Sequence, residues 1–228
     1  MTAGLTVYMD QGTLQIDSNF KTAALAFRQT YTGPYSSNGS TAFIGTWYQF
    51  IIDVPSDVKF LFFASPEDRT IGLMKKSGTA HTFRTTAQGT IEVYGFKDAP
   101  PQVSAGGFGL QLFDANGTLT FDSSSSFMKI ANAFTVPTVG HLAESWPVAG
   151  RSYAVGLGVY PKSWRGASQN GLPWGVLMSY CVRVGPNSGG GGYAPIASRP
   201  WGSGGDAPPG DTPQASPPTA MIVDVTGL

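Results

Sequence analysis

The residues that could do chemistry are few and scattered in this chain of 228 residues. Two histidines, His81 and His141, lie one in each half of the sequence, and neither belongs to a recognisable catalytic or metal-binding motif. The single cysteine, Cys181, excludes an internal disulfide, and its apolar neighbours favour a buried small side chain. No spacing of acidic residues points to a glycosidase carboxylate pair. We therefore expect neither an enzymatic activity nor a cofactor.

One segment contains closely spaced oxygen groups of the kind that bind calcium. It holds Asp114, Asn116 and Gly117. An EF-hand loop places glycine at its sixth position and glutamate at its twelfth, and this segment fits neither. Asn-Gly tolerates positive φ, so the same residues suit a tight turn between two strands. The sequence therefore predicts a hairpin turn and no metal site here.

Large side chains on loops form a second group of candidates. Tryptophans crowd the C-terminal half, and several lie beside glycine or proline. Such side chains are common in sugar-binding surfaces and in protein interfaces, and they also cap hydrophobic cores. If they do not cap the core, the residues that we expect to contact a partner or receptor are Trp164, Trp174, Tyr193, Ile196 and Trp201.

Two copies of one short pattern position the predicted turns. Residues 109–123 read GLQLFDANGTLTFDS, and residues 4–18 read GLTVYMDQGTLQIDS, at a constant offset of 105 residues. Apolar and polar residues alternate on both sides of a glycine-containing turn, which is typical of a β-hairpin. We infer an internal duplication in which each copy opens with one hairpin. Its turn and strand-end residues are Gly12, Asp17, Asp114, Asn116, Gly117 and Asp122.

Strand-like segments follow each hairpin at spacings typical of a β-sandwich. The predicted strands are 20–32, 43–54, 58–64, 71–74, 79–85 and 90–96 in the first copy, and 127–136, 152–160, 175–184 and 220–226 in the second. An Ala-x-Ala-Phe string at 24–27 recurs at 131–134. We predict an all-β chain of two tandem sandwich-like domains, 1–98 and 109–228, joined by a Pro- and Gly-rich linker at 99–108.

The second copy carries an insert at residues 185–219 that the first copy lacks. Glycine and proline dominate it, and it contains few charged residues. Such a composition cannot bury enough apolar surface to fold alone. Two interpretations remain open. The insert is either a disordered surface loop or an extended arm that lies on a neighbouring subunit, with its large side chains as anchors.

The balance of charge excludes two classes of partner. The chain has 14 basic and 14 acidic residues, and charged residues make up only 12% of it. Such a surface offers no basic patch for nucleic acid or for an anionic membrane. No apolar run of ~18 residues is present, so we expect no membrane span. Without a basic and apolar leader, we expect the chain to be made in a cytoplasm.

The hairpin pattern resembles a motif of small tail-tip proteins of tailed bacteriophages. The residues that fit it are Gly109, Leu110, Leu112, Phe113, Asp114, Gly117, Leu119, Phe121, Asp122 and Ser123, whereas Met9 and Ile16 depart from it in the first copy. The resemblance implies a structural protein of the virion, at the tail tip or baseplate, without enzymatic activity. It suggests the tail hub and central fibre as partners, and a homo-oligomer of threefold or sixfold symmetry.

Two hypotheses of function follow from these patterns. The first is an assembly component that binds other tail proteins and contacts the host receptor. The second is a carbohydrate-binding, lectin-like β-sandwich, which is either the receptor-binding tip itself or a cell-surface lectin. The host partner of the chain would then be a bacterial surface glycan or, for the first hypothesis, a surface protein. The second hypothesis rests on the tryptophans of the C-terminal half.

Overall fold

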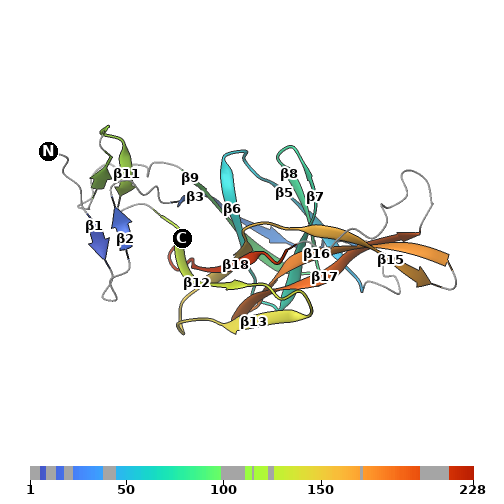
Figure 1. Cartoon of the computed structure of the whole chain (residues 1–228). Helices are drawn as coiled ribbons and strands as arrows, with labels where there is room; N and C mark the ends of the chain where they lie inside the picture. Colours follow the sequence, from blue (N-terminus) through green and yellow to red (C-terminus); the bar gives the residue numbers. More distant parts are fainter. Residues whose placement is uncertain are drawn as a thin grey trace.

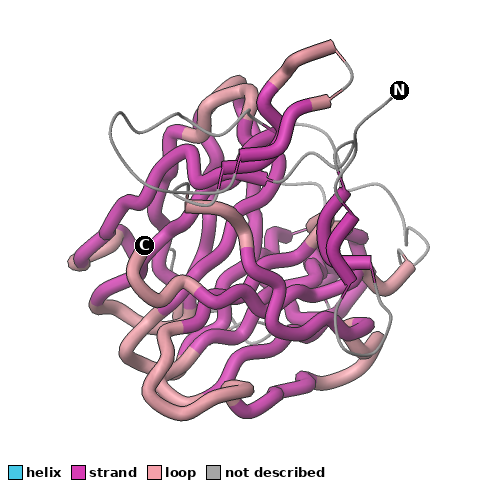
Figure 2. The backbone as a smooth tube through the Cα atoms, turned by 90° about the vertical axis from the view of Figure 1, so that its left-hand side faces the viewer, coloured by secondary structure: helices cyan, strands magenta, loops and turns pink. Residues whose placement is uncertain are grey.

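A computed structural model of the chain describes residues 6–8, 14–17, 23–37, 45–98, 111–114, 116–122, 126–169, 172–200 and 216–228. Within these ranges every regular element is a strand, and the tube of Figure 2 shows no helix. The predicted all-β fold is therefore confirmed. No helix able to cross a membrane occurs in the described ranges.

The predicted strands are recovered, most of them with shifted ends. The strands of the first half are β1 (Thr6–Tyr8), β2 (Leu14–Asp17), β3 (Ala23–Thr32), β4 (Ser36–Ser37), β5 (Tyr48–Asp53), β6 (Val58–Ala64), β7 (Arg69–Ser77), β8 (Ala80–Thr85) and β9 (Thr90–Asp98). Those of the second half are β10 (Gln111–Phe113), β11 (Leu119–Asp122), β12 (Lys129–Thr135), β13 (His141–Ser145), β14 (Tyr153–Leu157), β15 (Lys162–Gln169), β16 (Leu172–Val184), β17 (Ser188–Pro200) and β18 (Thr219–Asp224). Four of them, β4, β13, β15 and β17, fall where the sequence predicted no strand.

Two large antiparallel sheets form the body of the molecule, and each contains strands of both halves (Figure 1). The six-stranded sheet has the order β12-β18-β14-β6-β9-β3. The eight-stranded sheet has the order β13-β17-β16-β7-β8-β5-β4, with β15 also paired to β16. The linker expected at 99–108 lies outside the described residues, so the division into two domains stays a prediction.

The order of strands is mirrored about the middle of each sheet. From the middle outward, the six-stranded sheet reads β6-β9-β3 on one side and β14-β18-β12 on the other. The eight-stranded sheet reads β7-β8-β5 on one side and β16-β17-β13 on the other. Apart from the additional β4 and β15, each strand takes the same place in its half as its counterpart. The two halves therefore share one topology, as an internal duplication about a pseudo-twofold axis requires.

The two halves meet along a seam where equivalent strands pair with each other. β6 pairs with β14 through Phe63 and Val155, and β7 pairs with β16 over residues 69–72 and 181–184. Phe63 and Val155 are fully buried in the core between the sheets. The seam thus joins the halves by backbone hydrogen bonds and by apolar burial, which is the dominant favourable term in folding.

The six-stranded sheet buries side chains on both of its faces. Residues such as Phe63 face the eight-stranded sheet, whereas Phe62 and Val223 belong to a separate buried cluster. The two edges of this sheet meet at an isolated bridge between Ala24 and Phe127. Because the edges touch, the sheet curls toward closure, which agrees with the burial of its second face.

The two short hairpins are equivalent residue by residue. β1 and β2 pair as β10 and β11 do, with corresponding partners and a register shift at the same place. Figure 1 shows both hairpins off the large sheets. The predicted hairpins, including second strands that end at Asp17 and Asp122, are confirmed. Gly12 lies outside the described residues.

Asp114 organises the turn of the second hairpin, as predicted. Its Oδ1 atom accepts hydrogen bonds from the backbone amides of Asn116, at 2.9 Å, and Thr118, at 2.8 Å. Gly117 has a φ of 78°, in the left-handed region that glycine enters at little cost. These residues therefore act as turn residues, which is the role expected of them.

Residues 188–200 of the Gly- and Pro-rich insert are neither a disordered loop nor an arm that extends away from the chain. These residues form β17, which lies between β13 and β16 in the eight-stranded sheet. A Cβ atom at Gly190 would overlap the backbone oxygen of Leu142, and one at Gly192 would overlap His141. Glycine is therefore present because β13 approaches closely, and not because the segment needs freedom. Residues 201–215 lie outside the described part, so the arm stays a prediction there.

Candidate functional site

Two of the residues expected to contact a partner are buried inside the chain. The Tyr193 ring lies 4.7 Å from the Tyr180 ring, centroid to centroid, and its hydroxyl hydrogen-bonds with the Ser163 hydroxyl. Ile196 is fully buried in a cluster that includes Trp47. Because β17 is an internal strand, it turns Tyr193 and Ile196 into the body of this chain. Neither side chain is available to a partner in this structure.

Trp164 and Trp174, two of the tryptophans expected to contact a partner, lie on β15 and β16, whose far ends project from the body in Figure 1. Trp164 belongs to β15, and its side chain is outside the described part. Trp174 is half-buried on β16, where it pairs with Ala167 of β15 and with Pro200 of β17. Trp201 lies outside the described residues. The far ends of β15, β16 and β17, which we call the ribbon, therefore remain a predicted contact surface.

A pocket of about 410 Å³ at one end of the seam brings together groups from distant segments. It lies where the end of β6 and the start of β9 meet the start of β14, so both halves contribute to it. Its size is within the range of small-molecule sites. We call it the Trp146 pocket, and its lining residues are Ala64, Ser65, Pro66, Thr90, Glu92, Tyr94, Trp146, Arg151, Ser152, Tyr153, Gly185, Pro186 and Val225.

Trp146 supplies an aromatic wall of this pocket. Its ring stacks on Tyr153 with 5.4 Å between centroids and an interplanar angle of 28°. Its Nε1 atom donates a hydrogen bond to the backbone oxygen of Pro186 at 2.9 Å. Gly189 leaves room for the ring, since a Cβ atom there would overlap it. The indole is thus held in place before any ligand arrives, which lowers the entropic cost of binding.

Glu92 supplies a fixed carboxylate. It accepts hydrogen bonds from the Tyr94 hydroxyl at 2.5 Å and from Arg28 Nη2 at 3.0 Å. Burial disfavours the charged form, but these hydrogen bonds bring the pKa of Glu92 below its ordinary value. Burial and the adjacent carboxylate raise the pKa of Tyr94. At neutral pH the pocket therefore holds an ionised carboxylate beside a protonated phenol.

Arg151 supplies a cation at the start of β14. Its Nη1 atom donates to Asp224 Oδ2 at 2.6 Å, while 55% of the Arg151 side chain remains exposed. Burial disfavours the charge of Asp224, but hydrogen bonds from Thr226 and Arg151 lower the pKa of this carboxyl. A guanidinium carries five N–H donors, so this ion pair leaves donors for a ligand.

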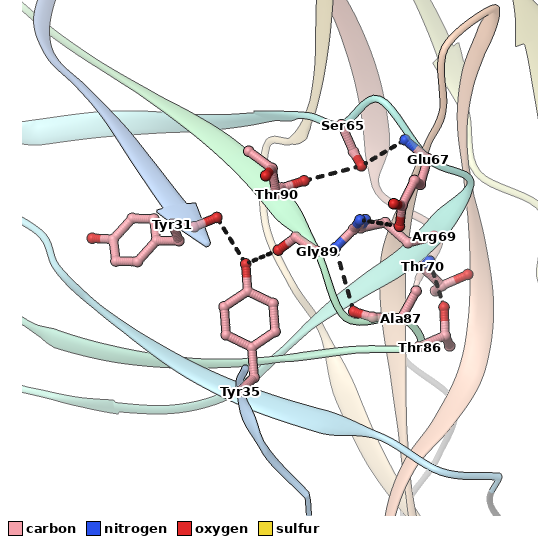
Figure 3. A network of polar contacts seen from close by, with 10 residues as sticks. All are labelled: Tyr31, Tyr35, Ser65, Glu67, Arg69, Thr70, Thr86, Ala87, Gly89 and Thr90. Atoms are coloured by element: carbon pink, nitrogen blue, oxygen red, sulfur yellow. Dashed lines mark hydrogen bonds and ion pairs between the residues drawn. The ribbon is translucent and has the colours of Figure 1, made fainter. Parts of the chain in front are cut away.

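A buried arginine braces the loop at the rim of the Trp146 pocket (Figure 3). The Arg69 side chain is fully buried, and its Nη2 atom pairs with Glu67 Oε2 at 2.9 Å. Its Nη1 atom donates to the backbone oxygen of Ala87 at 3.3 Å. The Ser65 hydroxyl donates to the Thr90 backbone oxygen at 3.2 Å and accepts from the Glu67 amide at 3.1 Å. Two pocket residues, Ser65 and Thr90, are thereby fixed.

This set of groups suits the binding of a neutral, hydroxyl-rich ligand. A sugar ring offers apolar C–H groups to an aromatic face, and hydroxyls to charged and polar side chains. The low pKa of Glu92 makes it a weak general base near neutral pH, because efficient proton transfer needs a pKa close to the working pH. The arrangement therefore favours recognition over catalysis.

The remaining candidates for chemistry lie elsewhere. Cys181 is fully buried, as predicted, and burial raises the pKa of its thiol. Burial lowers the pKa of His81 and of His141. Among the residues that the structure describes, no three His, Cys, Asp or Glu side chains gather as metal ligands would.

Comparison of the chain with protein-family models, with curated proteins and with solved structures finds no match. Function must therefore be inferred from the arrangement of side chains. The Trp146 pocket has no single linear signature, because Trp146 and Arg151 lie in the loop between β13 and β14 whereas Glu92 lies on β9. Only the fold brings Glu92 to the other two.

Proposed function

We propose that this chain is a non-enzymatic structural component of a bacteriophage tail tip or baseplate, where it binds other tail proteins and contacts the host receptor. The observation that carries the proposal is the repeated hairpin, whose copies pair in the same register and whose sequence resembles the tail-tip motif. The partners that we propose are the tail hub and the central fibre. The chain forms a threefold or sixfold homo-oligomer in the virion after synthesis in the host cytoplasm.

A free strand edge supports this assembly role. Among the described strands, β13 pairs with β17 alone. Apolar residues flank β13 on both sides, with Val139 84% exposed and Val148 51% exposed. Unpaired backbone groups on such an edge are a template for a strand of another chain. We therefore propose that β13 pairs with a neighbouring tail protein.

Ala143→Pro tests this edge. The Trp146 amide donates to the Asn187 backbone oxygen, which lies just before β17. Amide directions alternate along a strand, so the amide of Ala143, three residues earlier, points away from β17. Proline at 143 removes only an outward donor, so the fold should persist while pairing with a neighbour is lost. Light scattering after size exclusion, on the full chain alone and with co-expressed hub and fibre proteins, should show the assembly reduced to smaller species.

The matched control is Ala143→Thr, which keeps the N–H group and should assemble normally. A chain that stays monomeric and binds neither tail protein would contradict the tail-tip proposal itself. Normal assembly of the proline variant would contradict only the role of β13.

The Trp146 pocket favours a second candidate function, the binding of a bacterial surface glycan. The pre-positioned indole, the ionised Glu92 and the partly free Arg151 guanidinium support it. The two functions are compatible, since a tail-tip protein that contacts the host surface would use such a site.

Trp146→Ala should weaken glycan binding by about tenfold or more, because buried aromatic anchors dominate binding energies. Glu92→Gln keeps the shape of the pocket and should weaken binding through lost charge-assisted hydrogen bonds. Glycan arrays followed by titration measure both effects. The controls Trp164→Ala and Trp174→Ala alter the ribbon of β15 to β17. If they abolish binding and the pocket variants do not, the site lies on the ribbon.

A further inference from the structure

A second cavity, of about 190 Å³, lies at the opposite end of the β6–β14 pair. We call it the His81 pocket. It is formed where the start of β6 and the turn region of β7 and β8 meet the end of β14. Because β6 and β14 are antiparallel and equivalent, their two ends are exchanged by the internal pseudo-symmetry. The His81 pocket is therefore the counterpart of the Trp146 pocket in the other half.

Matching hydrogen bonds make this equivalence specific. The Val54 amide, after β5, donates to the Thr79 oxygen at 2.8 Å. The Trp146 amide, after β13, donates to the Asn187 oxygen at 3.1 Å. Val54 thus corresponds to Trp146. Continuing along β8 and β17, His81 corresponds to the glycine at position 189.

The sizes of the side chains at these two pairs of equivalent positions are reversed between the halves. In the second half, the large Trp146 ring lies where Gly189 leaves room for it. In the first half the smaller Val54 faces a histidine, and both residues line the cavity. The same pair of scaffold positions therefore holds a tryptophan with a glycine in one pocket, and a valine with a histidine in the other. The pockets have diverged in chemistry as well as in size.

The polar groups of the His81 pocket are donors or cations. Lys59, Lys76, His81 and Tyr160 line it, and no carboxylate occurs among its described lining residues. Nδ1 of His81 and the hydroxyl of Tyr160 are buried, and neither donates a hydrogen bond to a described residue. Buried polar groups in native proteins nearly always have a partner. A ligand with acceptor oxygens would supply one to each.

Neighbouring charges add to the positive field. The Lys162 ammonium donates to the Met74 backbone oxygen at 3.0 Å. Burial, and then the nearby Lys76, lower the pKa of Lys162. The other walls are apolar, and include Leu73 and Leu157. A ligand that fits must therefore combine a compact apolar body with an anionic group.

We propose that the His81 pocket binds a small organic carboxylate, with His81 and Tyr160 hydrogen-bonding to the carboxylate and Lys59 and Lys76 supplying the opposite charge. A monoanion is favoured over a dianionic phosphate, because the apolar walls make desolvation of a second charge costly. The cavity is larger than one of 150 Å³ that holds benzene, so the body is about the size of one aromatic ring. This proposal rests on the cavity alone and does not depend on the tail-tip assignment.

Titration of the full chain with benzoate, followed by calorimetry and by the NMR signals of the His81 ring, tests the proposal. Benzoate should bind, and benzamide, its uncharged counterpart of the same shape, should bind at least tenfold more weakly. Lys76→Gln and Tyr160→Phe should each weaken benzoate binding about tenfold. Lys75→Gln changes the adjacent exposed lysine of β7, which does not line the cavity, and should leave binding unchanged.

Two sources of such a carboxylate are separated by a second arm of the experiment. A short peptide that ends in phenylalanine with a free carboxylate is compared with the same peptide amidated at its C-terminus. If benzoate and the peptide with a free carboxylate bind but the amidated peptide does not, a chain terminus is a ligand. If benzoate binds and neither peptide does, the ligand is a free organic acid. Absence of benzoate binding, or equal binding of benzoate and benzamide, would overturn the proposal.

Discussion

Gly190→Ala should destabilise the chain by about 3 kcal/mol or more, since it forces an extra atom into a closely packed strand pair. The added Cβ would overlap the backbone oxygen of Leu142, and backbone cannot move aside as a flexible side chain can. β13 would have to separate from β17 to relieve the overlap. Because Trp146 follows β13 directly, the Trp146 pocket should open at the same time.

Chemical denaturation of the full chain measures the loss of stability, and the difference in fluorescence between variants with and without Trp146 reports on the pocket. Gly45→Ala is the matched control, since a Cβ atom at Gly45 meets no atom within 4 Å. If Gly190→Ala and Gly45→Ala have the same midpoint of unfolding, then β13 does not approach β17 as described.

Glu67→Ala should cost about 3 kcal/mol although Glu67 itself is 58% exposed, because it leaves the buried Arg69 guanidinium without its carboxylate. Surface substitutions usually change stability by no more than about 0.5 kcal/mol, so this effect would stand out. The loop that carries Ser65 should also loosen, since the Glu67 amide is bonded to the Ser65 hydroxyl. Thermal and chemical unfolding measure the loss.

The double variant Glu67→Ala with Arg69→Met separates charge from packing. Methionine fills much of the buried volume and removes the unpaired charge, so it should recover most of the lost stability. If the double variant is as unstable as the sum of its parts, the buried charge is not the cause.

The parts of the fold that the sequence predicts well are strands rich in apolar, β-branched and aromatic residues. β6 was predicted at its observed bounds because VKFLFFA is apolar, β-branched and aromatic, and is ended by Ser-Pro. β17 was missed because its first residues are four glycines after a serine, which carry no apolar signal. Their suitability for a strand comes from the approach of β13, a tertiary contact that no local pattern contains.

The sequence predicts the duplication, but the Ala-x-Ala-Phe match aligns β3 with β12 two residues away from their structural equivalence. Matching the Ala-x-Ala-Phe strings pairs residue 24 with residue 131. The register shift of β3 lies between Leu25 and Phe27, and that of β12 between Ile130 and Asn132. The shifts are therefore related by the same offset of 105 residues as the hairpins. A β-bulge fixes the equivalence more reliably than a chance likeness of letters, because it must keep its place in the sheet.

The candidate pockets could not be predicted from sequence at all. Their lining residues come from strand ends on both sides of the seam, and that seam exists only once the halves have paired. Tyr193 and Ile196, which the sequence suggested as surface anchors, are core residues because β17 pairs inside the eight-stranded sheet. Aromatic and branched side chains serve cores and interfaces alike, and only the strand pairing tells the two apart.

The shared sheets are the basis of both pockets, and Gly72→Cys tests them most directly. Gly72 of the first half pairs with Cys181 of the second, and a Cβ atom at Gly72 would lie 3.9 Å from the Cβ of Cys181. That separation suits a disulfide. Under mild oxidation the folded variant should form an intramolecular disulfide, seen as the loss of two hydrogens in intact mass, whereas Gly45→Cys should not. If the folded Gly72→Cys protein keeps both thiols free, or links only between molecules, the two halves do not share a sheet.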